Sequence, residues 1–320
     1  MLNLAFDARD AHAAPVRGWG RYARHLLEHL PGPVLAYSQG GPGPELFWEQ
    51  IAFPLLARRD RAAVLHAPNC FLPLRRPCPG VVTIHDLAFE AHPEDFSRRT
   101  GAKYRWCTPR AARSAERIIC VSQFTADDVV ARYGVARAKV RVIANAPGLP
   151  VTDAPPPEGG PYLLAVGDLR GKKNLGRLIE AHGRLGTGHR LLLAGLGTAP
   201  EGLPPAVEAL GWVDDARLDA LMRGADVLVH PSLYEGFGLV VAEAMVRGTP
   251  VACARATALP ETAGGAAVLF DPLDVGAIAA GIREALARGE ELRIAGRERA
   301  RAWSWAASAA ATQAVYEELV

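Results

Sequence analysis

Short apolar segments alternate with longer amphipathic ones along the whole chain, and this alternation narrows the possible folds more than any other feature. Strands that alternate with helices form parallel sheets whose faces the helices cover. We therefore predict an α/β protein with two doubly wound, Rossmann-like sheets. The strand candidates are 3–8, 34–37, 64–66, 81–84, 118–121 and 140–143, followed by 162–167, 190–195, 226–230, 250–254 and 266–270.

The alternation is interrupted once, at residues 146–161, where Pro and Gly dominate and no apolar periodicity remains. Such a stretch is typical of an exposed connection. A chain of 320 residues also suits two domains of ordinary size. We predict an N-terminal domain over 1–150 and a C-terminal domain over 151–320, and the Ala-rich last helix could pack back on the first domain.

Composition indicates an ordinary globular protein, with 49% hydrophobic and 22% charged residues. The first residues lack the basic and apolar regions of a signal peptide, and no run of about 18 apolar residues occurs. The five cysteines lie far apart, which indicates buried thiols in a reducing compartment. We expect a cytoplasmic protein, and peripheral contact with the inner membrane face stays open.

Charge is distributed unevenly although the net charge is only +2. Residues 1–150 carry 20 Lys and Arg against 13 Asp and Glu, and the remainder carries 16 against 21. The asymmetry fits either an anionic acceptor or membrane surface facing the first half, or two domains whose solvated faces differ. No dense basic run occurs, and we expect no nucleic-acid partner.

Polar residues follow several predicted strands of the first half, where ligands of open parallel sheets bind. Each of them alone could equally be a turn or cap residue. Together they predict a ligand-binding rim along one edge of the sheet; they are Asp7, Gly18, Trp19, Gly20, Asn69, His85, Asp86, Ser122 and Asn145.

A phosphate-binding loop is predicted in YLLAVGDLRGKKNLGRLIEAH, residues 162–182. A strand ends at Gly167, the loop carries Arg170, Lys172 and Lys173, and Asn174 can cap the next helix. Cationic side chains and helix N–H groups both favour phosphate oxygens. A diphosphate site is therefore predicted, although a merely solvated basic loop is the alternative.

Two glutamates mark the segment 225–252, which reads as a strand, a glycine-bearing loop and a helix. Glu235 lies in the loop and Glu243 lies eight positions later, inside the helix. Gly238 allows the backbone to approach a ligand closely. Because carboxylates accept hydrogen bonds from hydroxyl groups, the pair fits a nucleotide sugar better than a nucleoside triphosphate.

These motifs closely resemble those of the group 1 (family four) retaining glycosyltransferases of GT-B type. The resemblance rests on the glutamate pair in EGFGLVVAEAM and on the GDLRGKKNL loop, and it extends over nearly the whole chain. Further matching segments are GWGRYARHLLEHL, TIHDLAFEAHPEDF, SAERIICVSQFTADDVVARYGV, KVRVIANAP, LGWVDDARLDALMRGADVLVHPS and ALPETAGGAAVLFDPLD. The implied fold has two Rossmann-like domains that face each other across a cleft.

The resemblance also implies residue roles. Glu235 would hold the donor sugar, Glu243 the ribose, and Lys173 the diphosphate, while His85 would lie beside the donor sugar at the reaction centre. The remaining implied donor contacts are Gly18 and Gly20 as a flexible loop over the phosphates, the amides of Gly238, Leu239 and Val240, and the backbone at Trp212 and Val213 for the nucleobase.

The chain departs from the family pattern at Asp168, where many relatives carry an arginine. Arg170 or Lys172 could supply the missing cation. Neither of the pairs Asp127–Asp128 and Asp214–Asp215 has the strand context of a metal site, so we read them as caps or solvated faces. We predict that the protein needs no metal and no cofactor apart from its nucleotide sugar substrate.

The implied activity is retaining transfer of a hexosyl group from a nucleotide diphosphate sugar, GDP-mannose or another GDP- or UDP-hexose. The mannosyl and rhamnosyl branches look closest, and the acceptor is an unidentified glycan, lipid-linked or small molecule. Two alternatives stay open: a non-catalytic nucleotide-sugar-binding protein, or an epimerase or hydrolase on the same fold. A Rossmann dehydrogenase is disfavoured because no GxGxxG follows the first strand.

Overall fold

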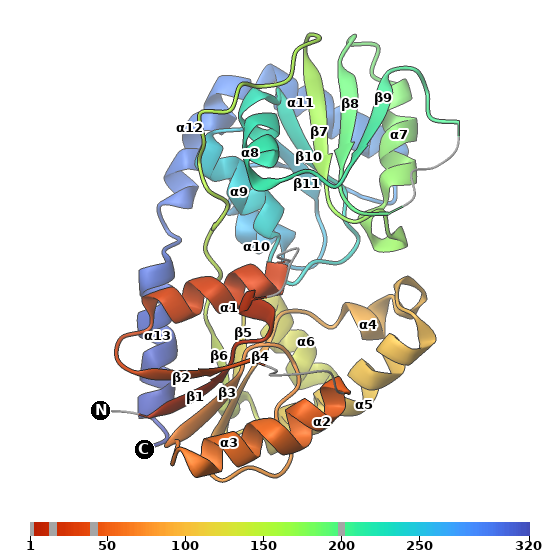
Figure 1. Cartoon of the computed structure of the whole chain (residues 1–320). Helices are drawn as coiled ribbons and strands as arrows, with labels where there is room; N and C mark the ends of the chain where they lie inside the picture. The colour runs from red at the N-terminus through yellow and green to blue at the C-terminus, as the bar shows by residue number, and fades with distance from the viewer. Residues whose placement is uncertain (1–2, 13–17, 39–43, 198–201) are drawn as a thin grey trace. The chain divides into compact units, whose positions relative to one another are not determined.

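The computed structural model describes residues 3–12, 18–38, 44–197 and 202–320. The chain divides into two compact units (Figure 1). Unit 1 comprises Met1–Ala146 together with Trp303–Val320, and unit 2 comprises Pro147–Ala302. The division therefore falls between Ala146 and Pro147, and the last helix packs with the first unit.

The sheet of unit 1 has six strands in the order β2-β1-β3-β4-β5-β6, and all neighbouring strands run parallel. Its strands are β1 (Leu4–Asp7), β2 (Val34–Tyr37), β3 (Val64–Ala67), β4 (Gly80–Ile84), β5 (Arg117–Cys120) and β6 (Val140–Val142). Its helices are α1 (Gly18–His29), α2 (Glu45–Phe47), α3 (Phe53–Arg59), α4 (Ala88–Ala91), α5 (Arg98–Ser114), α6 (Gln123–Tyr133) and α13 (Trp305–Glu317).

Alternation along the strands of unit 1 feeds two separate cores. In β1, Leu4 and Phe6 pack into a core with α1 and α13, whereas Ala5 packs into a core with α3, α5 and α6. A side-chain period of two places successive residues on opposite faces of a sheet. The sheet is thus covered on both faces, as predicted.

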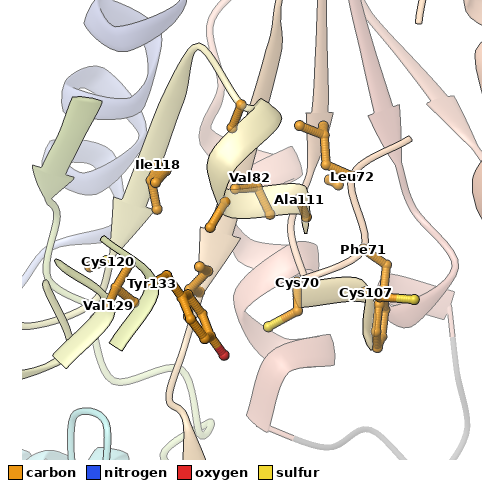
Figure 2. Packing of buried hydrophobic residues seen from close by; sticks show 14 of the residues in the cluster. Cys70, Phe71, Leu72, Val82, Cys107, Ala111, Ile118, Cys120, Val129 and Tyr133 are labelled. Atoms are coloured by element: carbon orange, nitrogen blue, oxygen red, sulfur yellow. The ribbon is translucent and has the colours of Figure 1, made fainter. Parts of the chain in front are cut away.

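Figure 2 shows part of the core that α5 and α6 cover, where Cys70, Cys107 and Cys120 pack among apolar side chains. Burial raises the pKa of the Cys70 thiol to about 12. All five cysteines are free thiols, four of them buried, as the sequence predicts.

Unit 2 contains a second parallel sheet with the order β12-β11-β10-β7-β8-β9. Its strands are β7 (Tyr162–Val166), β8 (Arg190–Ala194), β9 (Val207–Gly211), β10 (Val227–His230), β11 (Val251–Ala254) and β12 (Val268–Phe270). Its helices are α7 (Leu175–Gly183), α8 (Asp215–Gly224), α9 (Leu239–Arg247), α10 (Leu259–Ala263), α11 (Val275–Ala287) and α12 (Gly289–Ala300). Helix α7 packs beside α11, while α8 and α12 pack beside α9.

Two local expectations are corrected. The sequence predicts five strands for unit 2, and the structure adds a sixth, β9, at one edge of the sheet. Asn174 has a left-handed backbone, with φ of 57°, and its side chain does not cap α7. Its amide instead donates to the carbonyls of Pro231 and Pro272, 3.2 and 2.7 Å away, and so ties the loop before α7 to neighbouring loops.

Candidate functional site

The loop between β7 and α7 follows a tight path that glycines permit. Gly167 has φ of 148°, a region that favours glycine. A Cβ atom placed on Gly195 would lie 1.9 Å from the Gly167 carbonyl oxygen, so Gly195 has room only for hydrogen. A short 3₁₀ helix at Gly171–Lys173 then places Lys173 one residue before Asn174, which directly precedes α7. The loop therefore places the Lys173 side chain near the carboxyl end of β7.

Lys173, Glu235 and His230 form one hydrogen-bonded group. Lys173 Nζ lies 2.5 Å from Glu235 Oε1, and His230 Nε2 lies 2.9 Å from the same oxygen. Because a carboxylate only accepts, both nitrogens donate to it. A small hollow beside the group is lined by residues at the ends of β7 and β10, including Lys173 and His230. Two predicted site residues, Lys173 and Glu235, thus come together.

This group is electrostatically polarised. Burial would raise the pKa of Glu235, but the charge of Lys173 and the hydrogen bond from His230 outweigh it and hold this pKa well below its usual range. Burial lowers the pKa of His230 despite its contact with Glu235. At neutral pH the group is therefore an ammonium, a carboxylate and a neutral imidazole.

The N-terminus of α9 lies in the same sequence segment as Glu235. Gly238 precedes the helix with φ of 93°, and a Cβ there would lie 2.7 Å from Leu259 Cδ2. The N–H of Val241 already donates to the Gly238 carbonyl, so the N–H groups of Leu239 and Val240 precede the first intrahelical bond. Such amides form a site for anions.

Glu243 is buried and its carboxylate already accepts several hydrogen bonds. Oε1 accepts from the amides of Gly148 and Leu149 at 2.7 and 2.8 Å, and Oε2 accepts from Arg247 Nη1 at 2.8 Å. Arg247 Nε also donates to Asp219 Oδ1 at 2.7 Å. The carboxylate is therefore fixed in orientation, and a contact between Glu243 and ribose stays a prediction.

Arg170 and Lys172, the two candidates to replace the family arginine, differ in exposure. Arg170 lies 3.3 Å from the Asp168 carboxylate, and both side chains are partly exposed. Lys172 is buried, and its carbonyl accepts a hydrogen bond from the amide of Leu233. Arg170 is thus the more accessible of the two. Trp212 and Val213 lie between β9 and α8, and Trp212 is 57% exposed.

The predicted site residues of unit 1 lie at α1 and β4. His85 directly follows β4, and its Nε2 lies 2.8 Å from the Pro68 carbonyl oxygen. Burial lowers the pKa of His85. Gly18 and Gly20 were expected in a loop, but they form the first turn of α1. The first N–H groups of a helix need no intrahelical partner, so glycines are tolerated there.

Sequence reasoning missed His230 and Arg247. His230 ends strand β10, so the rule that polar residues at strand ends reach ligands could have indicated it. Arg247 lies four residues after Glu243, a spacing that brings two side chains together on one helical face. Its contacts with the carbonyls of Leu149 and Pro150 could not be read from spacing.

We read the pairs Asp127–Asp128 and Asp214–Asp215 as caps or solvated faces and not as metal ligands, and their side chains contact neighbouring residues. Asp214 caps α8 by accepting from the amide of Arg217, Asp127 accepts from Gln123, and Asp128 pairs with Arg132. Within the described ranges, no group of three or more His, Cys, Asp or Glu side chains gathers where a metal could bind. Among the same residues, no helix has the length and apolarity needed to cross a membrane.

Known proteins resemble this chain along its length. Residues 152–303 match the family described as "Glycosyl transferases group 1", and residues 14–146 match "Glycosyltransferase Family 4". O-antigen chain mannosyltransferase B of Escherichia coli is 31% identical over 76% of this chain and 71% of its own length. The chain belongs to the group 1 glycosyltransferases. It is accordingly a glycosyltransferase enzyme.

Further relatives agree with this assignment. The MMP alpha-(1->4)-mannosyltransferase of Mycolicibacterium hassiacum is 29% identical to this glycosyltransferase over 92% of the chain and 79% of its own length. The solved structure of sucrose-phosphate synthase from Thermosynechococcus elongatus superposes with a TM-score of 0.78 at 23% identity, over 100% of this chain and 99% of that one. The predicted GT-B fold is confirmed.

Proposed function

We propose that this glycosyltransferase moves a hexosyl group, with retention, from GDP-mannose or another GDP- or UDP-hexose to a glycan, lipid-linked or small-molecule acceptor. The observation that carries the proposal is the group of Lys173, His230 and Glu235, whose glutamate lies in the loop that leads into α9. Two relatives named as mannosyltransferases support a mannosyl donor.

Diphosphate binding would redistribute the charges of this group. Lys173 now donates to Glu235, and a diphosphate would offer it a stronger anionic partner. The first N–H groups of α9 add donors from the backbone. Glu235, still held by His230, would then be available to accept hydrogen bonds from sugar hydroxyl groups. Donor binding thereby turns an internal ion pair into two ligand contacts.

The chemistry we propose needs no dedicated base. In the front-face process that the family resemblance implies, the bond between the anomeric carbon and the phosphate oxygen breaks, and the acceptor oxygen forms a new bond to that carbon on the same face. The departing phosphate oxygen takes the proton of the acceptor hydroxyl. Lys173 and the helix amides stabilise the charge on the departing diphosphate, a role that a divalent cation fills elsewhere. We assign His85 to the donor sugar at the reaction centre, and Arg170 to the place of the missing arginine.

Charge on α5 supports an anionic acceptor or surface for unit 1. Arg98–Ser114 contains six Lys and Arg and no Asp or Glu, and Trp106 on this helix is 47% exposed. We propose that the enzyme works in the cytoplasm and makes peripheral contact with the inner membrane face through α5. Flotation with anionic and with neutral vesicles tests this, since binding to both alike, or to neither, contradicts it.

The transferase proposal is tested by calorimetry with a panel of nucleotide sugars, followed by incubation of the tightest binder with and without candidate acceptors. Acceptor-dependent release of nucleoside diphosphate, with the anomeric configuration kept in the product, supports the proposal. Release without any acceptor would indicate a hydrolase. Tight binding without turnover would indicate a non-catalytic binding protein.

A further inference from the structure

Tyr22 contacts the imidazole of His85 inside unit 1. The two rings meet edge to face, with centroids 4.7 Å apart and planes at 83°. Tyr22 belongs to α1, whose first turn carries Gly18 and Gly20, and its side chain is buried. The centroid of the Trp305 ring system lies 5.9 Å from that of the Tyr22 ring. Tyr22 therefore connects α13 to His85 through aromatic contacts.

The hydroxyl group of Tyr22 begins a buried chain of hydrogen bonds. It lies 3.0 Å from Thr83 Oγ1, which lies 2.9 Å from His66 Nε2. His66 Nδ1 lies 2.6 Å from the hydroxyl of Tyr316. All four side chains are at most 2% exposed, and they come from α1, β4, β3 and α13. The chain thus crosses from one helix through two strands to another helix.

The imidazole of His66 is suited to the centre of this chain. Burial, together with a smaller effect of the nearby His85, lowers its pKa to about 3. A neutral imidazole has one donor and one acceptor nitrogen, and here each nitrogen meets a hydroxyl group. Hydroxyl groups can donate or accept, so both nitrogens of His66 are satisfied. A buried polar chain that is fully satisfied holds its members in one geometry.

His85 is fixed at one nitrogen by the backbone. The Pro68 carbonyl can only accept, so Nε2 of His85 carries the proton and Nδ1 is the acceptor nitrogen of the neutral ring. Its own carbonyl accepts from Thr125 Oγ1 at 3.3 Å. In addition to these hydrogen bonds, the Tyr22 ring packs edge to face against the imidazole.

We propose that Tyr22 is a positioning residue for His85, and that the chain through Thr83, His66 and Tyr316 holds it in place. The helix α13, which follows unit 2 in the sequence, thereby helps to orient the histidine that the proposed function assigns to the reaction centre. A ring that is free to rotate would present Nδ1 in several directions. Misplacement of this kind lowers turnover more than binding.

Three variants separate the parts of this arrangement. Tyr22→Phe keeps the ring and removes the hydroxyl group, Tyr22→Leu removes the ring, and Tyr316→Phe breaks the far end of the chain. Tyr133→Phe is the matched control, because Tyr133 is a buried tyrosine of the same unit whose hydroxyl donates to Glu90. Tyr133 belongs neither to the hydrogen-bond chain that begins at Tyr22 nor to the ring contact between Tyr22 and His85.

The first measurement is long-range ¹H–¹⁵N NMR of the histidine rings without any substrate, with the His85 signals assigned through His85→Gln. Wild type and Tyr133→Phe should show His85 neutral with the proton on Nε2. Tyr22→Leu should shift and broaden these signals, and Tyr22→Phe and Tyr316→Phe should do so to a smaller extent. If Tyr22→Leu does not fold, Tyr22→Phe decides the test. Unchanged His85 signals would overturn the proposal.

The second measurement is steady-state kinetics with the donor found by calorimetry. Turnover should fall at least about tenfold in Tyr22→Leu and several-fold in Tyr22→Phe and Tyr316→Phe, with the donor KM nearly unchanged. An equal rise of KM in all variants would contradict positioning. Because the NMR measurement needs no donor, a wild-type protein without transferase activity but with the expected His85 signals would refute the proposed function and keep the positioning role.

Discussion

Arg247 and Glu243 lie one turn apart on α9, and Nη1 of the arginine donates to Oε2 of the glutamate at 2.8 Å. The same guanidinium donates to Asp219, and both carboxylates accept hydrogen bonds from the backbone of residues 148–152. The buried side chains of Arg247, Glu243 and Asp219 thus bond residues 148–152, at the start of the predicted connection, to helices α8 and α9 of unit 2. The glutamate predicted to bind ribose is also a structural residue.

Removing Arg247 should destabilise unit 2 strongly. Arg247→Met leaves the carboxylates of Glu243 and Asp219 without their shared partner, and breaking a buried ion pair in this way costs about 3–5 kcal/mol. Arg288→Met is the matched control, because Arg288 makes i,i+3 and i,i+4 pairs on the exposed surface. Thermal unfolding should show a large drop in Tm for the first variant and little change for the second. Equal Tm values would contradict this account of α9.

Substitution of Glu243 should affect nucleotide binding, whereas substitution of Glu235 should affect turnover. Glu243→Ala should weaken binding of the bare nucleoside diphosphate by about 1.5–3 kcal/mol, because it would remove the charge-assisted hydrogen bond that we predict between Glu243 and ribose. It should also lower Tm, since Gly148 and Leu149 lose their acceptor. Glu235→Ala should leave nucleoside diphosphate binding nearly unchanged and reduce turnover. Titration calorimetry decides, and equal losses of nucleotide affinity in both variants would refute the two roles.

Removing Lys173 should raise the pKa of Glu235. Lys173 is the main charge that holds this pKa below its usual range against the effect of burial. In Lys173→Met burial is opposed mainly by His230, so the carboxyl group should take up its proton at a higher pH. Carboxyl ¹³C NMR titration measures this directly, with Lys103→Met, in unit 1, as a control. If the pKa of Glu235 is unchanged in Lys173→Met, this prediction is wrong, and His230 alone holds that pKa low.

Acid should destabilise unit 1 through His66. Its pKa is about 3 in the folded chain and about 6.5 when unfolded, so the unfolded state binds one more proton in between. The contribution of this residue to stability is therefore complete near pH 8 and falls by about 2 kcal/mol between pH 8 and pH 5. His66→Gln, which can both donate and accept but does not titrate, should flatten the decline by that amount. Urea unfolding at both pH values provides the test.

Transfer activity should survive an excess of EDTA. The proposed charge partners of the diphosphate are Lys173 and the first amides of α9, which chelation leaves in place. Activity is measured before and after dialysis against EDTA, and then with added magnesium or manganese. Loss of activity that either metal restores would show that a divalent cation carries the diphosphate charge.

The fold was predictable because buried parallel strands carry continuous apolar runs, such as VVTI before His85. Strand β9 escaped prediction because it is an edge strand in which only Val207 is buried. Their motifs marked Lys173 and Glu235 as candidate site residues, and the structure brings the two side chains together, while their roles stay predictions. The linker amides on Glu243 and the chain from Tyr316 to Tyr22 were not predictable, because tertiary packing brings together residues that are far apart in sequence.

The discontinuity of unit 1 bears on the order in which the protein is made. A ribosome adds Trp303–Val320 only after all of unit 2, so unit 1 lacks α13 throughout the synthesis of unit 2. During that interval the imidazole of His66 has no Tyr316 to meet, and the apolar face that α13 later covers is open to water. The support that we propose for His85 is therefore complete only once Trp303–Val320 has been made.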